Sequence, residues 1–550
     1  MNSPSGKHEK KVRSAEGRKV RGEEATGALR PSSVRTFLPS SVVRPFAVIV
    51  VLLLAASFLA NSMTKEVSRD EQMYCTAGVL LGQGQTIYRD FSYPSQLPYH
   101  PLLLATLYRS LGTTHYLLAG RLVSVLCDIL VAIFILLIYR SVFGSYRRSG
   151  LLLGLAAAVL YVFNPVVDYA AGYAWNHDAV ILCVVASLWL FVTTDFQKGS
   201  RFWRMAVVGA LLTLATGTRV TTVLIELLFL AGVPFIAGGS VGNRLRTALP
   251  FCAAALIVAL WPLWVMAQAP RAFWLNLVQI PTLYGRWLHE IGKTFDKAAL
   301  TIDALTQPGY LALLALGVYL VVIVWRERSR LDRTERQKAV VAALLPLLFF
   351  VIAYIPPTMW HQYLAVPAPF IAIALAYPLA ALRRHAEQSR NGRWYKLTCG
   401  LMGAAAIVTV LACRPVLERC LFLAVPERWT PIEFHRLSVK IGADLKEPGP
   451  VLTLGPLHAL EGGRDIYPEL SCGSVVYRVA DRMRAQERQI THTVGPETLP
   501  ELVRVHPPAA VIVGVEPSYF ASLEEPLRKL VPPDWLRDTY SDTLQVYRRP

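Results

Sequence analysis

The chain has 550 residues, of which 53% are hydrophobic and only 17% are charged. A soluble globular protein usually carries about 25% charged residues, so this composition argues against a single water-soluble core and against a disordered chain. Lys and Arg (56) outnumber Asp and Glu (38), for a net charge of +18. The basic residues lie between apolar runs and near the N-terminus, which indicates membrane topology rather than nucleic-acid binding.

The first part of the chain predicts a tail followed by a membrane span. Residues 1–44 are polar and basic without periodicity, which is typical of a disordered cytoplasmic tail. The apolar run Pro45–Met63 is too long, and its basic leader too extended, for a cleaved signal peptide, so we expect an uncleaved first span. Further apolar runs raise the expected total to about eleven spans. These runs are 118–140, 150–168, 178–194, 204–218, 221–237, 248–268, 309–325, 338–356, 362–382 and 396–413.

The basic loops fix the predicted topology. With a cytoplasmic N-terminus and about eleven crossings, every strongly basic loop faces the cytoplasm. Merging 204–237 into one crossing would move Arg244 and Arg246 outside, so we predict two spans in that region. The same parity puts the loop 64–117 and the C-terminal tail outside the cytoplasm. The basic loops contain Arg147, Lys198, Arg244, Arg326–Lys338 and Arg383–Lys396.

The sequence therefore predicts a polytopic α-helical membrane protein with a small extracytoplasmic α/β C-terminal domain. The membrane domain is expected over residues 45–424 and the C-terminal domain over 425–550. In the latter, Val451–Leu454 and Ala509–Val513 are short apolar strands, with a helical stretch near Val479–Arg488 between them.

A short polar helix is predicted just after the first span. Met73, Ala77 and Leu80 share one face at helical spacing, which predicts an amphipathic helix at the outer membrane interface. Ser68 and Glu71 have the spacing of a capping box. Glu71 is therefore expected to be structural or to share two roles, whereas Asp70 is not needed for the cap and lies where the interface opens to water.

Several motifs stand in and after this loop. The acidic pair Asp70-Glu71 is followed by a stretch ending in Tyr88-Arg-Asp-Phe91 and by Pro98-Tyr-His-Pro-Leu-Leu103. Further along the chain are Arg121-Leu-x-Ser124, Asn164-Pro165, Thr218-Arg219 and His361-Gln-Tyr363. Over roughly 45–385 these motifs resemble those of the GT-C glycosyltransferases, in particular the bacterial protein-mannosyltransferase and aminoarabinose-transferase branch.

The resemblance implies transfer of a sugar, with inversion, from a polyprenyl-phosphate donor to a hydroxyl of a lipid, glycan or protein acceptor. The site would lie on the extracytoplasmic face of a bacterial-type cytoplasmic membrane, in loop 64–117. Such a reaction needs a general base and cationic groups for the departing phosphate. Asp70 is the expected base, kept ionised by Arg69, with Glu71 as the second acid of the catalytic pair.

The remaining site residues are also carried over from the resemblance. Arg219 and Arg121 are expected to bind the donor phosphate, since a guanidinium binds phosphate bidentately. The cavity and the acceptor are expected to be contacted by Asp178, His100, His361 and Tyr363. The aromatic segment Phe273–Phe295, with Trp274, Tyr284 and Trp287, is expected either to cover the cavity as a lid or to anchor the chain at the interface.

No cofactor or metal site is predicted, because P-loop, complete dinucleotide and zincin motifs are missing. A divalent cation near Asp178 stays an alternative. The alternative function is a secondary transporter or lipid flippase that uses the intramembrane acids Asp128 and Glu226. A transporter is expected to have related halves, and the sequence reveals none.

Overall fold

The computed structural model describes residues 40–293, 296–327, 331–389 and 392–550. The predicted disordered tail therefore lies, up to residue 39, outside the described residues. Helix α1 (Ser40–Thr64) begins before the predicted start of the first span. The backbone of residues 40–44 is thus helical rather than part of a disordered tail.

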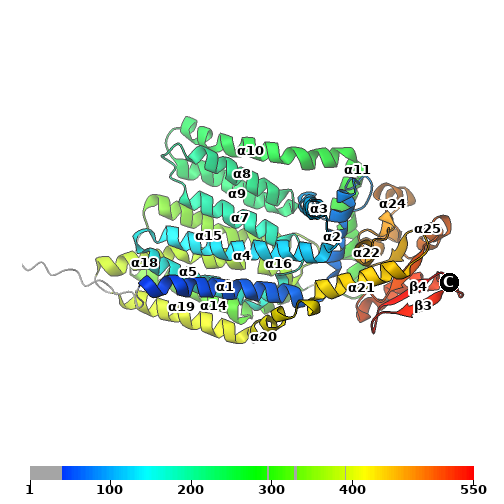
Figure 1. Cartoon of the computed structure of the whole chain (residues 1–550). Coiled ribbons are helices and arrows are strands. Elements are labelled where there is room, and N and C mark those ends of the chain that lie inside the picture. Colours follow the sequence, from blue (N-terminus) through cyan, green and yellow to red (C-terminus); the bar gives the residue numbers. More distant parts are fainter. Residues whose placement is uncertain (1–39, 294–295, 328–330, 390–391) are drawn as a thin grey trace, which may run out of the picture. The chain divides into compact units, whose positions relative to one another are not determined.

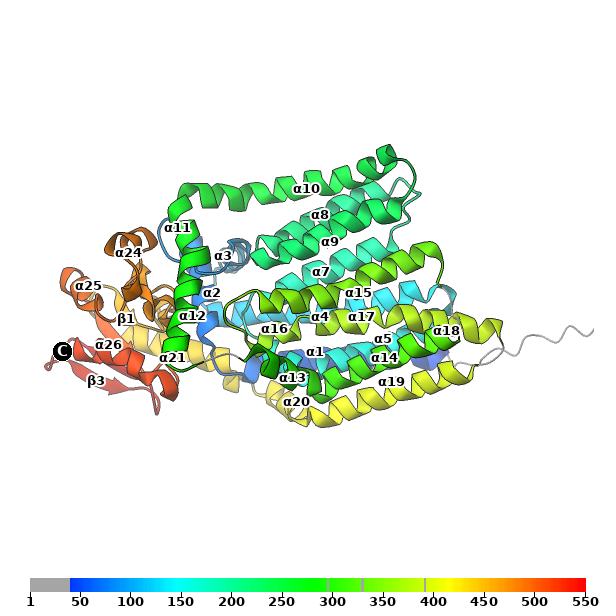
Figure 2. The same ribbon diagram turned by 180° about the vertical axis from the view of Figure 1, so that it is seen from behind.

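Every predicted apolar run forms a helix or a chain of short helices, and these run roughly side by side in a bundle (Figures 1 and 2). The prediction of a polytopic helical membrane protein is confirmed. The bundle helices after α1 are α4 (Tyr116–Val142), α5 (Arg147–Val162), α7 (His177–Thr193), α8 (Arg201–Thr216), α9 (Val223–Ala237), α10 (Val241–Gln268), α14 (Pro308–Arg326), α15 (Arg333–Tyr354), the consecutive α16 (His361–Ala365), α17 (Ala368–Ala374) and α18 (Ala376–Gln388), and α19 (Arg393–Ala412).

Within the described ranges, 8 of these helical segments are long and apolar enough to cross a membrane. Helices α5, α7 and α8 are shorter, at 16, 17 and 16 residues. A helix rises only about 1.5 Å per residue, so these three reach less far than the shortest of the 8 segments, Val220–Ala237 with 18 residues. The total of about eleven crossings therefore stays a prediction.

The region 204–237 contains two separate helices, as predicted. Helix α8 ends at Thr216, and α9 begins at Val223 after the short 3-10 turn η2 (Val220–Thr222). Gly217 lets this junction pack closely, because a Cβ there would collide with the Tyr99 ring of α3 (Tyr99–Leu111). The α8–α9 junction is thereby held against the start of α3.

Short helices cross one end of the bundle in both views (Figures 1 and 2). Helix α2 (Arg69–Gly82) packs on α3, and Gly78 permits the close approach because a Cβ there would lie 2.7 Å from Leu104 Cβ. The other helices at this end are α6 (Pro165–Ala170), α11 (Pro270–Trp274), the π-helical turn η3 (Leu275–Gln279), α12 (Ile280–Glu290) and α13 (Lys297–Thr306).

Helix α2 departs from the predicted amphipathic interface helix. Its side chains are buried from Glu71 through Leu80, on the polar face as well as the apolar one. The polar face is covered by the C-terminal part of the chain, where the Leu457 N–H donates to Gln72 Oε1 at 3.0 Å. The helix therefore lies between α3 and the C-terminal segment instead of facing lipid headgroups.

The residues after α19 form short helices around a small mixed sheet. The strand order is β1-β2-β4-β3, with β1 (Val451–Thr453) parallel to β2 (Ala510–Val513) and the hairpin β3 (Leu536–Thr539)–β4 (Gln545–Arg548) antiparallel. The predicted strands correspond to β1 and β2, which are buried throughout, as expected of continuous apolar runs. The C-terminal hairpin was not predicted, because its strand β3 is mostly exposed and polar.

The helical stretch predicted near Val479–Arg488 is broken in two, into η7 (Ala480–Arg482) and α24 (Ala485–Thr491). The domain boundary predicted at residue 425 stays a prediction. The further helices of this part are α20 (Arg414–Arg419), α21 (Thr430–Asp444), α22 (Pro456–Glu461), α23 (Ser474–Tyr477), α25 (Leu499–Val505) and α26 (Glu525–Lys529), with the 3-10 turns η4 (Cys420–Ala424), η5 (Pro426–Arg428), η6 (Pro468–Leu470) and η8 (Ser518–Glu524).

Candidate functional site

The Asp70 carboxylate lies in the first turn of α2 and takes no part in the cap of that helix. The predicted capping box is present: the Ser68 side chain and the Glu71 carboxylate satisfy the first N–H groups of the helix. The Ser68 N–H donates to Glu71 Oε2 at 2.9 Å. Asp70 accepts no hydrogen bond and forms no ion pair within the described part of the chain, and its side chain is half-buried.

Burial raises the pKa of Asp70 above its ordinary value. The charges of Arg69 and Arg478 act in the opposite direction, but burial has the larger effect. Arg69 therefore lowers the pKa of Asp70 as expected, but burial raises it by more. An accessible carboxylate with a raised pKa is a better proton acceptor than an ordinary aspartate.

Arg219 lies on the same side of the molecule, in the extended segment between α8 and α9. Its Nη1 lies 2.8 Å from Nδ1 of His177, the first residue of α7. Its guanidinium also stacks over the Tyr363 ring, 4.7 Å from the ring centroid. Both partners are uncharged groups, and no described carboxylate pairs with Arg219.

Two tyrosines connect the Asp70 and Arg219 groups. The charges of both residues act on Tyr74, whose pKa is raised mainly by burial, then by Asp70, and lowered by Arg219. Tyr363 likewise interacts electrostatically with both. Arg219 thus contacts Tyr363 directly, and Asp70 lies within electrostatic range of both tyrosines.

The Arg121 guanidinium is bound by the protein itself. All five N–H donors of its buried guanidinium are used: Nε and Nη2 donate to the two oxygens of Glu71, both at 2.9 Å, and Nη1 and Nη2 also donate to the carbonyls of Ser62, Lys65 and Glu66. These contacts tie α1 and α2 to α4 and favour a structural role for Arg121 over the predicted phosphate contact.

Both carboxylate oxygens of Glu71 likewise accept hydrogen bonds, and the side chain is not accessible to a substrate. Besides Arg121, its carboxylate accepts the N–H groups of Ser68 and Ala174, the latter at 2.7 Å. Its side chain is fully buried. This favours the structural role that the capping box suggested over direct participation in proton transfer.

The other predicted cavity residues occupy different positions around the Asp70–Arg219 region. His100 is buried edge-to-face beneath Tyr74, with ring centroids 5.2 Å apart, and burial lowers its pKa to about 3. His361 is partly exposed and pairs with Asp303 at 3.0 Å. Asp178 faces inward, where Ser124 donates to it and one carboxylate oxygen has no partner among the described residues.

Glu226 and Asp128, the two acids of the transporter alternative, differ in their hydrogen bonding. Both oxygens of Glu226 accept hydrogen bonds, from Thr213 and Thr216 at 2.6 Å each, so this carboxylate connects α9 to α8. Asp128 accepts a long hydrogen bond from Tyr161 at 3.5 Å. Glu226 therefore has a structural explanation that requires no transported ion.

Residues that the sequence analysis missed complete the surroundings of Asp70. Arg478, which follows α23, donates to Tyr284 Oη at 3.2 Å and to Glu516 Oε2 at 3.2 Å. Tyr284 belongs to the predicted lid segment and stands half-buried on α12, whereas Trp274 is 59% exposed; Phe295 lies outside the described residues. Local sequence contains no signal for Arg478, because only the fold of the C-terminal segment brings it to α2.

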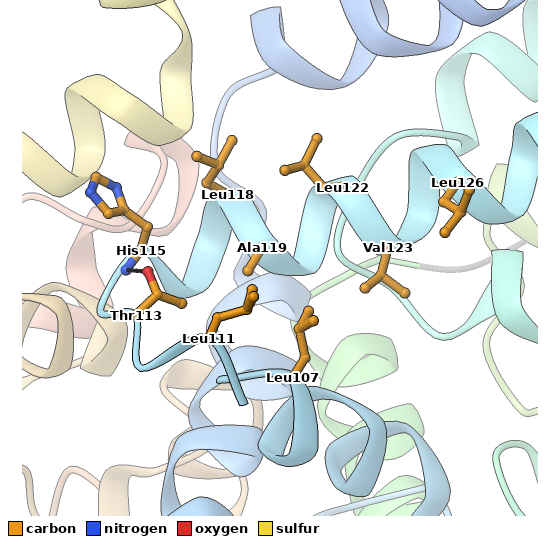
Figure 3. A pocket seen from close by; sticks show the side chains of 9 residues that line it. All are labelled: Leu107, Leu111, Thr113, His115, Leu118, Ala119, Leu122, Val123 and Leu126. Atoms are coloured by element: carbon orange, nitrogen blue, oxygen red, sulfur yellow. Dashed lines mark hydrogen bonds between the residues drawn. The ribbon is translucent and has the colours of Figure 1, made fainter. Parts of the chain in front are cut away.

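One apolar groove near this end is separate from Asp70. It has a volume of about 370 Å³ and lies between α3 and α4 (Figure 3). His115 and Thr113 stand at one end of it, beside a row of leucines, and none of the predicted site residues lines it. Among the described residues, no group of three or more His, Cys, Asp or Glu side chains could hold a metal ion, so the divalent-cation alternative finds no ligand set there.

Comparison with solved structures finds the same fold in a known protein. ArnT from Cupriavidus metallidurans bound to undecaprenyl phosphate matches with a TM-score of 0.55 at 14% identity, over 92% of this chain and 98% of ArnT. Its apo state gives a TM-score of 0.54 at 13% identity, over 92% and 97%. AglB from Archaeoglobus fulgidus, in complex with an inhibitory peptide and a dolichol-phosphate, gives 0.49 at 11%, over 92% and 74%.

The predicted GT-C resemblance is thereby confirmed at the level of the fold. No family model matches the sequence, and no curated protein is similar to it in sequence. The similarity lies in the arrangement of the helices and not in the sequence. The roles of individual residues are therefore inferred from their own contacts in this structure.

Proposed function

We propose that this chain is a membrane glycosyltransferase that moves a sugar from a polyprenyl-phosphate donor to an acceptor hydroxyl. Asp70 acts as the general base and Arg219 binds the donor phosphate. The observation that carries this proposal is a pair of charges that both act on Tyr74. Among the described residues, the Asp70 carboxylate accepts no hydrogen bond and the Arg219 guanidinium pairs with no carboxylate. ArnT was solved with undecaprenyl phosphate, which makes that lipid the first donor-site probe.

The chemistry follows from these two groups. The acceptor hydroxyl attacks the anomeric carbon while Asp70 takes its proton, and the carbon–oxygen bond to phosphate breaks with its electron pair going to the phosphate. Attack opposite the leaving group inverts the anomeric centre, through a transition state of oxocarbenium character. Arg219 stabilises the charge that develops on the departing polyprenyl phosphate.

We place this site on the extracytoplasmic face of a bacterial-type cytoplasmic membrane, and the distribution of basic residues supports that orientation. The basic loops meet one another at the end of the bundle away from Asp70: Arg201 donates to Asn243 at 2.9 Å, and Lys338 donates to the Val192 carbonyl at 2.7 Å. Lys and Arg mark the cytoplasmic side of a membrane protein.

Fusions of alkaline phosphatase test this orientation, because the enzyme is active only after export. A fusion after Pro550 is expected to be active and a fusion after Gly199, in a basic loop, inactive. The reverse pattern would place Asp70 in the cytoplasm and remove the proposed donor orientation.

The catalytic assignment is tested with Asp70→Asn. The variant keeps the Ser68–Glu71 cap but cannot accept a proton, so we expect normal folding and loss of transfer. The assay incubates membranes that supply the acceptor with radiolabelled undecaprenyl-phosphate sugars and follows the release of undecaprenyl phosphate. Glu66→Gln is the matched control, because Glu66 is an exposed acid just before α2. Wild-type turnover in Asp70→Asn would exclude Asp70 as the base.

The donor assignment is tested by lipid binding rather than turnover. Arg219→Gln is expected to weaken binding of undecaprenyl phosphate about tenfold or more, the effect of losing a charge-assisted contact. Arg109→Gln, an exposed arginine on α3, is the control and should bind the lipid normally. Equal affinity in the two variants would reduce Arg219 to a packing residue.

A further inference from the structure

Three cations converge on a single aromatic ring beside Asp70. The Phe520 ring of η8 lies 4.9 Å from the Arg69 guanidinium, 4.5 Å from that of Arg478 and 4.2 Å from Lys293 Nζ, measured to the ring centroid. These cations come from α2, from the segment after α23 and from the segment after α12. We call Arg69, Arg478 and Lys293 the cation cluster.

The cation cluster contains more positive charge than the protein neutralises. Glu516 is its one ion-pair partner among the described residues, and its Oε2 accepts from both Arg69 at 3.4 Å and Arg478 at 3.2 Å. Lys293 pairs with no described carboxylate. Three like charges around one carboxylate repel one another, and a bound anion would relieve that repulsion.

A buried donor in the cluster has no partner. The Arg478 side chain is only 2% exposed, yet its Nε has no hydrogen-bond partner among the described residues. A buried N–H group without an acceptor is costly and is normally satisfied by protein, water or ligand. Lys293 and the neighbouring Tyr519 are exposed, so the cluster is reachable from water on one side.

We propose that the cation cluster binds an anionic group of the acceptor, a phosphate or a carboxylate, and thereby holds the acceptor hydroxyl beside Asp70. This inference rests on the proposed function and names the acceptor class within it. The charges of Arg69 and Arg478 both act on Asp70, so an anion bound by them lies next to the proposed base.

The position of the cluster assigns the anion to the acceptor rather than to the donor. The donor phosphate belongs with Arg219, and an inverting reaction requires the nucleophile and the leaving group to lie on opposite sides of the sugar. Arg69 is next to Asp70 in the chain and shares Glu516 with Arg478, whereas Arg219 interacts with His177 and Tyr363. Arg219 thus binds the leaving phosphate of the donor, and the cation cluster binds the anionic group of the acceptor.

The experiment uses the full chain in phosphatidylcholine nanodiscs with the donor site filled by undecaprenyl phosphate. Inorganic phosphate is titrated against chloride at constant ionic strength, and thermal unfolding reports binding, because a ligand stabilises the folded state by mass action. We expect phosphate to raise the unfolding temperature of the wild type. Lys293→Gln and Arg69→Gln should each weaken the apparent affinity about tenfold.

The controls separate this inference from the proposed function. Arg482→Gln removes a nearby arginine that pairs with Glu290 instead, and should bind phosphate like the wild type. Arg219→Gln should lose undecaprenyl phosphate but keep the phosphate response. Because Lys293 and Arg69 are accessible, they carry the test even where Arg478→Gln fails to fold.

Two results would overturn the inference. One is that phosphate does not raise the unfolding temperature of the wild type with a filled donor site. The other is that this rise persists in Lys293→Gln and Arg69→Gln, or that it is lost in Arg219→Gln. The proposed function fails on different results, namely absence of undecaprenyl phosphate binding or full transfer by Asp70→Asn. In the lipid-free Arg219→Gln protein, the phosphate titration still reports on the cation cluster.

Discussion

Replacement of Arg121 by Gln distinguishes a structural arginine from a phosphate-binding one. The substitution removes the partner of the Glu71 carboxylate, which is fully buried and bound to Arg121 through both oxygens. Breaking one side of a buried ion pair costs about 3–5 kcal/mol, because the remaining charge is left without compensation. The carbonyls of Ser62, Lys65 and Glu66 also lose their donors.

Such a loss is a large fraction of the stability of a folded domain, which is about 5–15 kcal/mol. We therefore expect a strongly lowered unfolding temperature and a reduced yield of folded protein in detergent. The folded fraction, isolated by size-exclusion chromatography, should bind undecaprenyl phosphate with the affinity of the wild type. Arg109→Gln is the control for removing an arginine at this end of the bundle.

The opposite result would refute this reasoning. An Arg121→Gln protein with wild-type stability and lost affinity for undecaprenyl phosphate would show that the guanidinium contacts the lipid. Glu71→Gln provides a second check, since it breaks the same ion pair from the other side and is expected to destabilise the protein similarly.

Three further predictions concern other parts of the site. Burial raises the folded-state pKa of Asp70 above its unfolded value, so the ionised carboxylate destabilises the folded protein at neutral pH. Asp70→Asn should therefore unfold at the same or a higher temperature than the wild type at pH 7. The wild-type transfer rate should fall as the pH drops through this raised pKa, because the base becomes protonated. Glu226→Gln should lower stability by about 1 kcal/mol and leave transfer intact, as measured in the radiolabel assay, whereas a transporter would lose function. Gly78→Ala should displace α2 from Leu104 and reduce transfer, while Gly82→Ala, whose Cβ would meet its nearest neighbour at 3.7 Å, should not.

The elements that could be predicted from the sequence are those with local signals. Apolar runs near the length of a membrane span gave the bundle helices, because a buried or lipid-facing helix needs no distant partner to be recognised. The cap of α2 was also visible, since Ser68 and Glu71 lie within one helical turn. The interruption after α5 is local as well: the Asn164 side chain accepts the Val166 N–H at 3.0 Å and starts a new helix before the predicted end of the run.

The parts that could not be predicted depend on contacts between distant segments. The partner of Arg121 is Glu71, 50 residues earlier, and nothing near Arg121 indicates whether its donors are used. The polar face of α2 was expected to meet water, but it is covered by a segment that follows 385 residues later, through Gln72 and Leu457. Arg478 shares Glu516 with Arg69 of α2 for the same reason, so its place near the site required the structure.

The number of acceptors around each guanidinium separates the arginines at this end of the molecule. Arg121 has a carboxylate and three carbonyls for its five donors, which leaves it no capacity to bind a ligand. Arg69 and Arg478 share one carboxylate, which leaves positive charge at the cation cluster. Among the described residues Arg219 has only an imidazole and an aromatic ring as partners, so its charge is the least compensated of the four. Charge that the fold itself does not neutralise is available for substrates, which is why we propose Arg219 for the donor phosphate and the cation cluster for the acceptor anion.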